Sequence, residues 1–290
     1  MSWPPANATI LVTGASTGIG NACALALADL GVHVFAGVRS EADRQFLSNA
    51  NADHVTPILL DVTDTASVAA AATKVTAALK GSHFIGLVNN AGIMISGPLE
   101  FVSQQDLQTQ MDVNVVGQMA VTRAFLPLLR EHQGRIVNIG STSGHIPSAF
   151  TGPYCASKYA LLALTDVLRM ELRPFGIHVA MIEPGVIATP IWSKVIKAEG
   201  ELQSNMAAES ETLYGHALAD RRLLLNRLDA SGGSPETVAT AVQHALLSQR
   251  PNTRYVLGLG TRIKLMVAKF LPNSIRDALK YVHTKLRRAE

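Results

Sequence analysis

Short apolar runs alternate with longer segments rich in alanine and leucine along most of this chain. The runs are apolar almost throughout, which is the pattern of strands buried on both faces of a sheet. Seven runs have this character: 8–13, 32–38, 55–60, 84–89, 135–140, 178–183 and 254–258. The periodicity of the intervening segments predicts helices over 18–30, 41–49, 64–79, 103–131, 154–174 and 235–248.

Repeated strand–helix units with strands buried on both sides predict a parallel sheet wrapped by helices. This is the α/β, Rossmann-type doubly wound fold, here with about seven strands. Ser103 and Asp106 have the spacing of a capping box, and Ser234 before Pro235 marks a helix start. No linker or low-complexity segment divides the chain, so we expect a single domain over 1–290.

Two regions break this rhythm. Residues 185–233 are polar, weakly periodic and too long for a simple connector, which is typical of a lid over a binding site. Residues 261–290 form a basic tail. Its basic residues interleave with apolar ones, as in a helix on a membrane surface. Packing of the tail on the sheet edge or on a neighbouring subunit is the favoured interpretation. The apolar positions are Leu265, Met266, Val267, Phe270 and Leu271.

Composition narrows the class of protein. The chain has 290 residues, 48% hydrophobic and 16% charged, which favours a large core over disorder. A net charge of +3 without a long basic run before the tail argues against nucleic-acid binding. There is no signal-peptide pattern, and no apolar run reaches the roughly 20 residues of a membrane-spanning helix. The two cysteines suggest a reducing compartment, so we expect a cytoplasmic protein. The nine histidines lack metal-binding spacing, and no metal site is expected.

A glycine-rich loop follows the first strand. In TGASTGIG (13–20), Gly14, Gly18 and Gly20 precede a predicted helix. Glycine lets the backbone turn tightly and approach a pyrophosphate, while the helix N-terminus supplies N–H donors. The loop therefore predicts binding of a dinucleotide cofactor.

The residues at the end of the second strand indicate whether the dinucleotide is NAD or NADP. A carboxylate there would bind the ribose hydroxyls of NAD, but Val38 occupies that place and Arg39 follows. An arginine fork matches the 2′-phosphate of NADP. We therefore expect NADP(H). NAD(H) remains open, because Arg39 could be a solvated loop residue and Thr17 is not a second cation.

Tyr154 and Lys158, in YCASK, are one helical turn apart and share a helix face. A lysine beside a phenol favours its anionic form, as an acid–base catalyst requires. Taken alone, this spacing is common on helix surfaces.

Together, the motifs resemble the short-chain dehydrogenase/reductase family over most of the chain. The matching motifs, in order, are Thr13-Gly14-xxx-Gly18-x-Gly20, Asp61-Val62, Asn89-Asn90-Ala91-Gly92, Asn114, Ser141, Tyr154-xxx-Lys158 and Pro184-Gly185.

The resemblance implies four catalytic residues. Tyr154 would exchange a proton with the substrate, and Ser141 would hydrogen-bond its carbonyl or hydroxyl oxygen. Lys158 would lower the tyrosine pKa and hold the nicotinamide ribose. Asn114 would anchor a water that extends the proton relay. It also implies a dimer or tetramer formed through 103–131 and 154–174.

The resemblance further implies the cofactor contacts. Asp61 and Val62 would contact the adenine, Asn90 and its neighbours the adenosine ribose, and Ile187 and Thr189 the nicotinamide amide. The full set, with the two catalytic residues that also touch the cofactor, is Gly14, Ser16, Thr17, Gly18, Ile19, Gly20, Arg39, Asp61, Val62, Asn90, Ala91, Gly92, Tyr154, Lys158, Pro184, Gly185, Ile187 and Thr189.

Short phrases such as IEPGVIATPIWSK resemble the branch containing hydroxysteroid and retinol dehydrogenases. With the apolar lid, they predict a lipophilic alcohol or ketone substrate. A 3-oxoacyl or small polyol substrate is the alternative, and a non-catalytic dinucleotide sensor is a third interpretation. His145 and Trp192 are candidate substrate contacts beside Ser141 and Tyr154.

Overall fold

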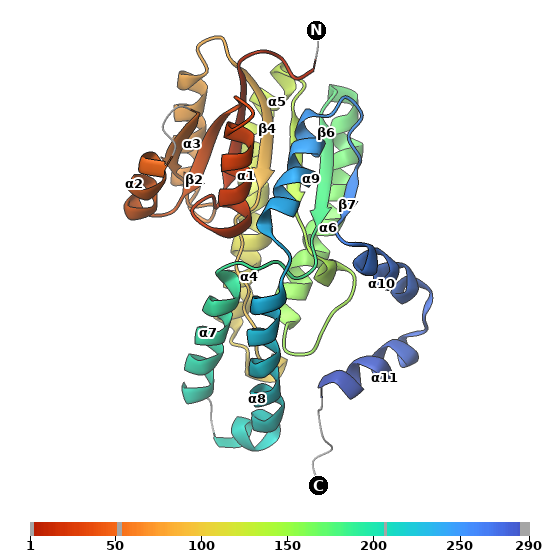
Figure 1. Ribbon diagram of the computed structural model, residues 1–290. Helices are drawn as coiled ribbons and strands as arrows, with labels where there is room; N and C mark the ends of the chain where they lie inside the picture. The colour runs from red at the N-terminus through yellow and green to blue at the C-terminus, as the bar shows by residue number, and fades with distance from the viewer. Residues whose placement is uncertain (1–2, 51–53, 206–207, 285–290) are drawn as a thin grey trace.

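A computed structural model describes residues 3–50, 54–205 and 208–284 and shows a seven-stranded parallel sheet (Figure 1). The strand order is β3-β2-β1-β4-β5-β6-β7. The order reverses between β1 and β4, which creates the crevice where such sheets bind ligands. The predicted fold class is confirmed. The strands are β1 Ala8–Thr13, β2 His33–Val38, β3 Val55–Leu59, β4 His83–Asn89, β5 Arg135–Ile139, β6 His178–Glu183 and β7 Arg254–Val256.

Helices cover both faces of the sheet, which explains the continuous apolar strands. In β1, Ile10 and Val12 pack in the core cluster of one face, whereas Leu11 packs in the cluster of the other; all three are fully buried. The first face is covered by α1 Gly18–Ala28, α2 Glu41–Ala50 and α9 Pro235–Leu247. The second is covered by α3 Thr65–Ala78, α5 Gln118–Glu131 and α6 Gly152–Leu172.

The predicted helix 103–131 is divided in three. Ser103 caps α4 Gln104–Met111 by accepting a hydrogen bond from the Asp106 amide at 3.0 Å. A π-helical turn, η2 Asp112–Gly117, then leads into α5. Single π turns within helices are frequent at functional sites, and Asn114 lies in this one.

The segment predicted as a lid forms two helices, α7 Ile191–Asn205 and α8 Ala208–Ser231. Figure 1 shows them side by side beyond the carboxyl ends of the strands. Their base is closed by a parallel bridge: the Ala188 amide donates to Gly233 O, and the Gly233 amide donates to Val186 O, both at 2.9 Å. The lid is therefore a helical hairpin whose two ends are joined.

The tail forms α10 Leu259–Phe270 and α11 Asn273–Thr284, beside the domain in Figure 1; residues 285–290 lie outside the described part. Packing on the sheet edge is contradicted for one stripe of α10, whose side chains are 46–79% exposed. We call it the α10 stripe: Leu259, Ile263, Met266, Val267 and Phe270. None of the helices in the described ranges is long and apolar enough to cross a membrane.

Candidate active site

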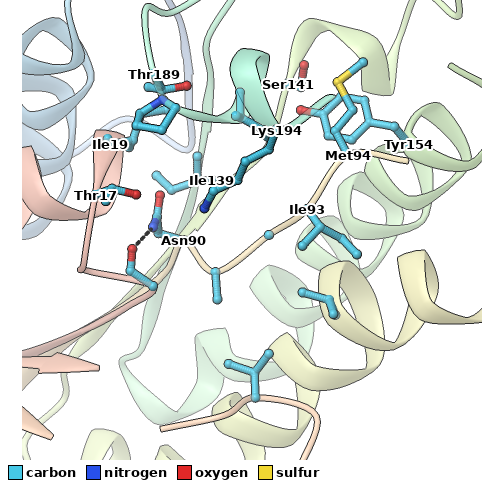
Figure 2. A pocket seen from close by; sticks show the side chains of 18 of the residues that line it. Thr17, Ile19, Asn90, Ile93, Met94, Ile139, Ser141, Tyr154, Thr189 and Lys194 are labelled. Atoms are coloured by element: carbon cyan, nitrogen blue, oxygen red, sulfur yellow. Dashed lines mark hydrogen bonds between the residues drawn. The ribbon is translucent and has the colours of Figure 1, made fainter. Parts of the chain in front are cut away.

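A pocket of about 650 Å³ opens at the carboxyl edge of the sheet, beside the point where the strand order reverses (Figure 2). The glycine loop, the ends of several strands, α6 and the lid line it. Almost all the residues predicted from the sequence meet here. They are Gly14, Ser16, Thr17, Gly18, Ile19, Arg39, Asp61, Val62, Asn90, Ala91, Gly92, Ser141, Tyr154, Lys158, Pro184, Gly185, Ile187, Thr189 and Trp192.

The backbone of the glycine loop requires glycine. Gly14 and Gly18 have φ of +63° and +57°, which side chains disfavour. A Cβ on Gly20 would lie 2.3 Å from Gly14 O, so Gly20 serves packing and does not line the pocket. Thr17 begins α1 without a side-chain cap, which leaves the N–H groups of the first turn available to a phosphate. This end of the pocket is chemically suited to a dinucleotide.

Asn90 holds the glycine loop against β4. Its Nδ2 donates to Thr13 O at 2.9 Å and to Gly14 O at 3.0 Å. Thr13 Oγ1 accepts from the amides of Asn90 and Ala91 at 2.9 and 3.0 Å. The structural role of Thr13 was not expected, and the contact of Asn90 with the adenosine ribose stays a prediction.

At the far end of the pocket, Arg39 is exposed and Val38 is buried, so no carboxylate ends β2. Asp61 Oδ1 accepts from the Thr63 amide and hydroxyl at 2.9 and 2.7 Å. Burial raises the pKa of Asp61, but the Thr63 hydrogen bonds and the Arg39 charge outweigh it and hold the pKa below its ordinary value. This end presents a cation to the pocket.

Ser141 follows β5 and caps a 3₁₀ turn, accepting from the Ser143 amide at 3.1 Å. Tyr154 and Lys158 lie one turn apart on α6, with the Lys158 amine 5.7 Å from the centre of the Tyr154 ring. Figure 2 shows Tyr154 and Ser141 at the same end of the pocket. Two hydroxyl groups can therefore meet one substrate oxygen.

Burial is the largest cause of the pKa shifts of both Tyr154 and Lys158. Burial raises the pKa of Tyr154, and the neighbouring Ser141 hydroxyl opposes this shift only in part. Burial also lowers the pKa of Lys158 to about 8, and its amine donates to Ile139 O at 2.8 Å. The lowering of the tyrosine pKa by Lys158 stays a prediction. A protonated tyrosine is suited to donating a proton to a carbonyl oxygen.

Asn114 is buried and does not line the pocket. Its Oδ1 accepts from the Ile93 amide at 2.9 Å, and its Nδ2 donates to Ile93 O at 3.0 Å and to Ser157 Oγ at 3.1 Å. The side chain thus ties the segment after β4 to α6, and the anchoring of a water stays a prediction.

The two candidate substrate contacts have different positions. His145 Nε2 lies 2.8 Å from Oε1 of the buried Glu183, and His145 is not among the lining residues. A buried carboxylate 38 residues away, invisible to local sequence reasoning, engages the ring. Trp192 does line the pocket, and its Nε1 donates to Ile187 O at 2.7 Å.

Sequence reasoning missed other lining residues, including Met94 after β4 and Lys194 on α7. A single methionine or lysine carries no local signal. In the described ranges, no cluster of three or more histidine, cysteine or carboxylate side chains could hold a metal ion.

Residues 8–200 match the family described as short chain dehydrogenase. The chain belongs to this family. Retinol dehydrogenase 16 of Homo sapiens is 36% identical over 277 residues, covering 94% of this chain and 87% of the relative. A short-chain dehydrogenase from Streptomyces avermitilis has a similar structure, with a TM-score of 0.75 and 28% identity over 97% of this chain and 98% of that one. A closed form of serine dehydrogenase, complexed with NADP+, has a TM-score of 0.70 and 27% identity over 86% of this chain and 94% of that one.

The predicted family and enzyme class are confirmed: the protein is an NAD(P)(H)-dependent oxidoreductase of alcohols and ketones. The bound cofactor supplies or accepts the hydride. When a carbonyl is reduced, negative charge develops on its oxygen, and hydroxyl donors placed beside that oxygen stabilise it.

Proposed function

We propose that this enzyme interconverts a lipophilic alcohol, of steroid or retinoid type, and its ketone or aldehyde. The observation that carries the proposal is an apolar wall in the pocket that Ser141 and Tyr154 also line. It comes from the segment after β4 and from the lid, and consists of Ile93, Met94, Ile191, Trp192, Val195 and Ala198. Such walls bind large apolar molecules, while a few polar groups fix their orientation. The similarity to a retinol dehydrogenase supports the same class.

In this proposal Tyr154 donates the proton to the carbonyl oxygen, and Ser141 donates a second hydrogen bond. Lys158 holds the nicotinamide ribose, and the π turn around Asn114 positions a water that connects Lys158 to solvent. The raised pKa of Tyr154, which favours the protonated phenol, supports the reductive direction.

NADP(H) is the proposed preferred cofactor. Arg39 lines the pocket at the end of β2, where Val38 leaves no carboxylate to bind the ribose hydroxyls. The structurally similar serine dehydrogenase is complexed with NADP+.

A series of ketones and aldehydes of increasing apolar size tests the substrate class. We expect kcat/KM to rise with apolar length, by about tenfold for every 1.4 kcal/mol of additional binding in the transition state, up to retinoid or steroid size. A matched series of 3-oxoacyl thioesters and polyols tests the alternatives. Higher kcat/KM for these polar compounds would contradict the proposal.

We also propose that the α10 stripe lies on an anionic membrane surface. Five exposed apolar side chains recur at helical spacing, and the exposed Arg262 and Lys264 lie on the same helix. This combination is typical of interfacial helices. The cytoplasmic location and the dimer or tetramer stay predictions.

A further inference from the structure

The lid carries a cation into the cofactor half of the pocket. Lys194 lies near the start of α7 and lines the pocket together with residues of the glycine loop. Figure 2 shows its side chain extending from the lid into the pocket, towards the side where Asn90 lies and away from Ser141 and Tyr154. The Lys194 ammonium group therefore faces the cofactor half of the pocket and not the position of the reacting substrate oxygen.

The position of Lys194 is fixed by contact between the lid and the glycine loop. A Cβ placed on Gly18 would lie 3.1 Å from Thr189 Cγ2 and 3.7 Å from Pro190 Cδ. The Lys194 amide donates to Pro190 O at 3.3 Å. The residues that touch the glycine loop are thus one helical turn before Lys194, and its side chain begins close to the phosphate-binding end of the pocket.

Lys194 has no counter-charge in the described ranges, where it forms no ion pair. The two carboxylates that line the pocket have other partners: Asp61 accepts from Thr63, and Asp112 accepts from Gln108 Nε2 at 2.7 Å. The unpaired Lys194 ammonium group and the residues at the uncapped N-terminus of α1 line the same pocket, and both groups attract anions.

We propose that Lys194 binds the pyrophosphate of the dinucleotide, so that the cofactor joins the glycine loop to the lid. This rests on the proposed function, because it requires that the pocket binds a dinucleotide. The first turn of α1 offers only neutral N–H donors, whereas pyrophosphate carries two negative charges; a cation on the lid supplies charge that the loop lacks. A lipophilic, uncharged substrate has no group that would pair with this lysine.

One consequence is that cofactor binding orders the lid. The bound pyrophosphate contacts α1 on one side and α7 on the other. The lid therefore closes over a pocket that already holds its cofactor, and the wall formed by Trp192 and Val195 is completed in that state.

Lys197 provides the matched control. It lies on α7, three residues further along, is exposed, and does not line the pocket. Lys197→Ala and Lys194→Ala remove the same charge from the same helix, so a general effect of net charge or of helix stability appears in both variants. Lys194→Arg keeps the charge and serves as the rescue.

The experiment measures dissociation constants by calorimetry for three ligands: NADPH, 2′-phospho-ADP-ribose, which retains the pyrophosphate but lacks nicotinamide, and 2′-AMP, which lacks the pyrophosphate. Lys194→Ala should weaken the first two by about tenfold or more, the usual size for a hydrogen bond to a charged group, and leave 2′-AMP unchanged. Lys194→Arg should recover most of the affinity, and Lys197→Ala should match the wild type. Hydrogen exchange of α7 should slow on NADPH binding in the wild type and less in Lys194→Ala.

Three results would overturn the inference. Unchanged NADPH affinity in Lys194→Ala would remove the contact. Equal weakening of 2′-AMP would show a diffuse effect of charge instead of pyrophosphate binding. Weakening of NADPH with 2′-phospho-ADP-ribose unaffected would place the lysine at the nicotinamide. Failure of the wild type to bind both NADPH and 2′-phospho-ADP-ribose would contradict the proposed function itself. This result is distinguishable because it involves no variant.

Discussion

Three cationic side chains line the pocket, and they differ in how deeply they are buried. Lys158 is buried beside Tyr154, whereas Arg39 and Lys194 are exposed. An exposed cation can bind a phosphate without first losing its hydration, while a buried amine is held by fixed hydrogen bonds and changes its pKa. This difference fits the proposal that different residues select the cofactor and transfer the proton.

Arg39→Asp should reverse the cofactor preference. The change removes the partner of the 2′-phosphate and places a carboxylate where the ribose hydroxyls of NAD would bind. We expect the NADPH-to-NADH ratio of kcat/KM to fall by at least tenfold, measured with one substrate. Arg44→Asp on α2, which also removes an arginine, half-exposed and outside the pocket, is the control. An unchanged ratio in Arg39→Asp would show that this arginine does not bind the phosphate.

Lys158 should make stability depend on pH. Its pKa falls from 10.5 to about 8 on folding, so between these values the unfolded chain binds a proton that the folded chain does not. The free energy of unfolding therefore rises with pH between these two pKa values. Below about pH 8 the folded chain holds a buried charged amine, which lowers its stability. Relative to Lys158→Met, the wild type should gain up to about 3 kcal/mol in free energy of unfolding between about pH 7 and pH 10.

Denaturant titrations at several pH values measure this difference. Lys74→Met removes an exposed lysine and reports the effect of losing charge at the surface. A stability difference between wild type and Lys158→Met that does not change with pH would contradict the burial of a titrating amine at this position.

The meeting of Ser141, Tyr154 and Lys158 in one pocket could be predicted because each lies in a motif with fixed spacing. Lys194 could not, since its position depends on the contact between Thr189 and Gly18, which are distant in sequence. The effect of burial on the Tyr154 pKa could not be predicted either, because burial is a property of the folded chain.

At the level of elements, the strands were predicted closely because two-sided burial produces continuous apolar runs. The π turn at Asp112–Gly117 was not, because an extra residue in a helix leaves the apolar period nearly unchanged. The two helices of the lid were not predicted, because residues 185–233 are only weakly periodic. The apolar periodicity of the lid helices is weak because some of their side chains face the pocket and others face the core.

Gly232→Ala should disturb the base of the lid. An added Cβ would lie 2.5 Å from the Ala188 amide nitrogen, beside the bridge between Ile187 and Gly233. The backbone must move, so we expect KM to rise several-fold and the thermal midpoint to fall by a few degrees, as for a loss of roughly 1 kcal/mol. Gly200→Ala on α7 is the control, since a Cβ there meets nothing within 4 Å. Equal kinetics in both variants would show that the bridge does not position the lid.

At the scale of the whole molecule, sheet order and layers follow from the repeated strand–helix units. The placement of the tail does not, because an amphipathic basic helix is equally compatible with packing on the domain and with an external surface. The exposure of the α10 stripe shows that this stripe does not pack on the rest of the described chain.

Met266→Asp should weaken binding to anionic vesicles. It places a charge in the centre of the α10 stripe, where it would enter the apolar part of the interface. We expect a several-fold loss in co-sedimentation, with little change in activity on a short, water-soluble ketone. Leu224→Asp on α8, which changes another exposed apolar residue, is the control. Equal co-sedimentation of the variants, or a change of oligomeric state in Met266→Asp alone, would contradict membrane contact.

The most direct test of the account is the replacement of Tyr154 by Phe, which removes one hydroxyl and keeps the ring that lines the pocket. Turnover of a lipophilic ketone with NADPH and the NADPH dissociation constant are measured on the same preparation. The account predicts loss of turnover by at least about 10²-fold, the usual contribution of a positioned acid, with NADPH affinity within twofold of the wild type. Turnover close to that of the wild type would show that Tyr154 is not the proton donor and would contradict the proposed chemistry.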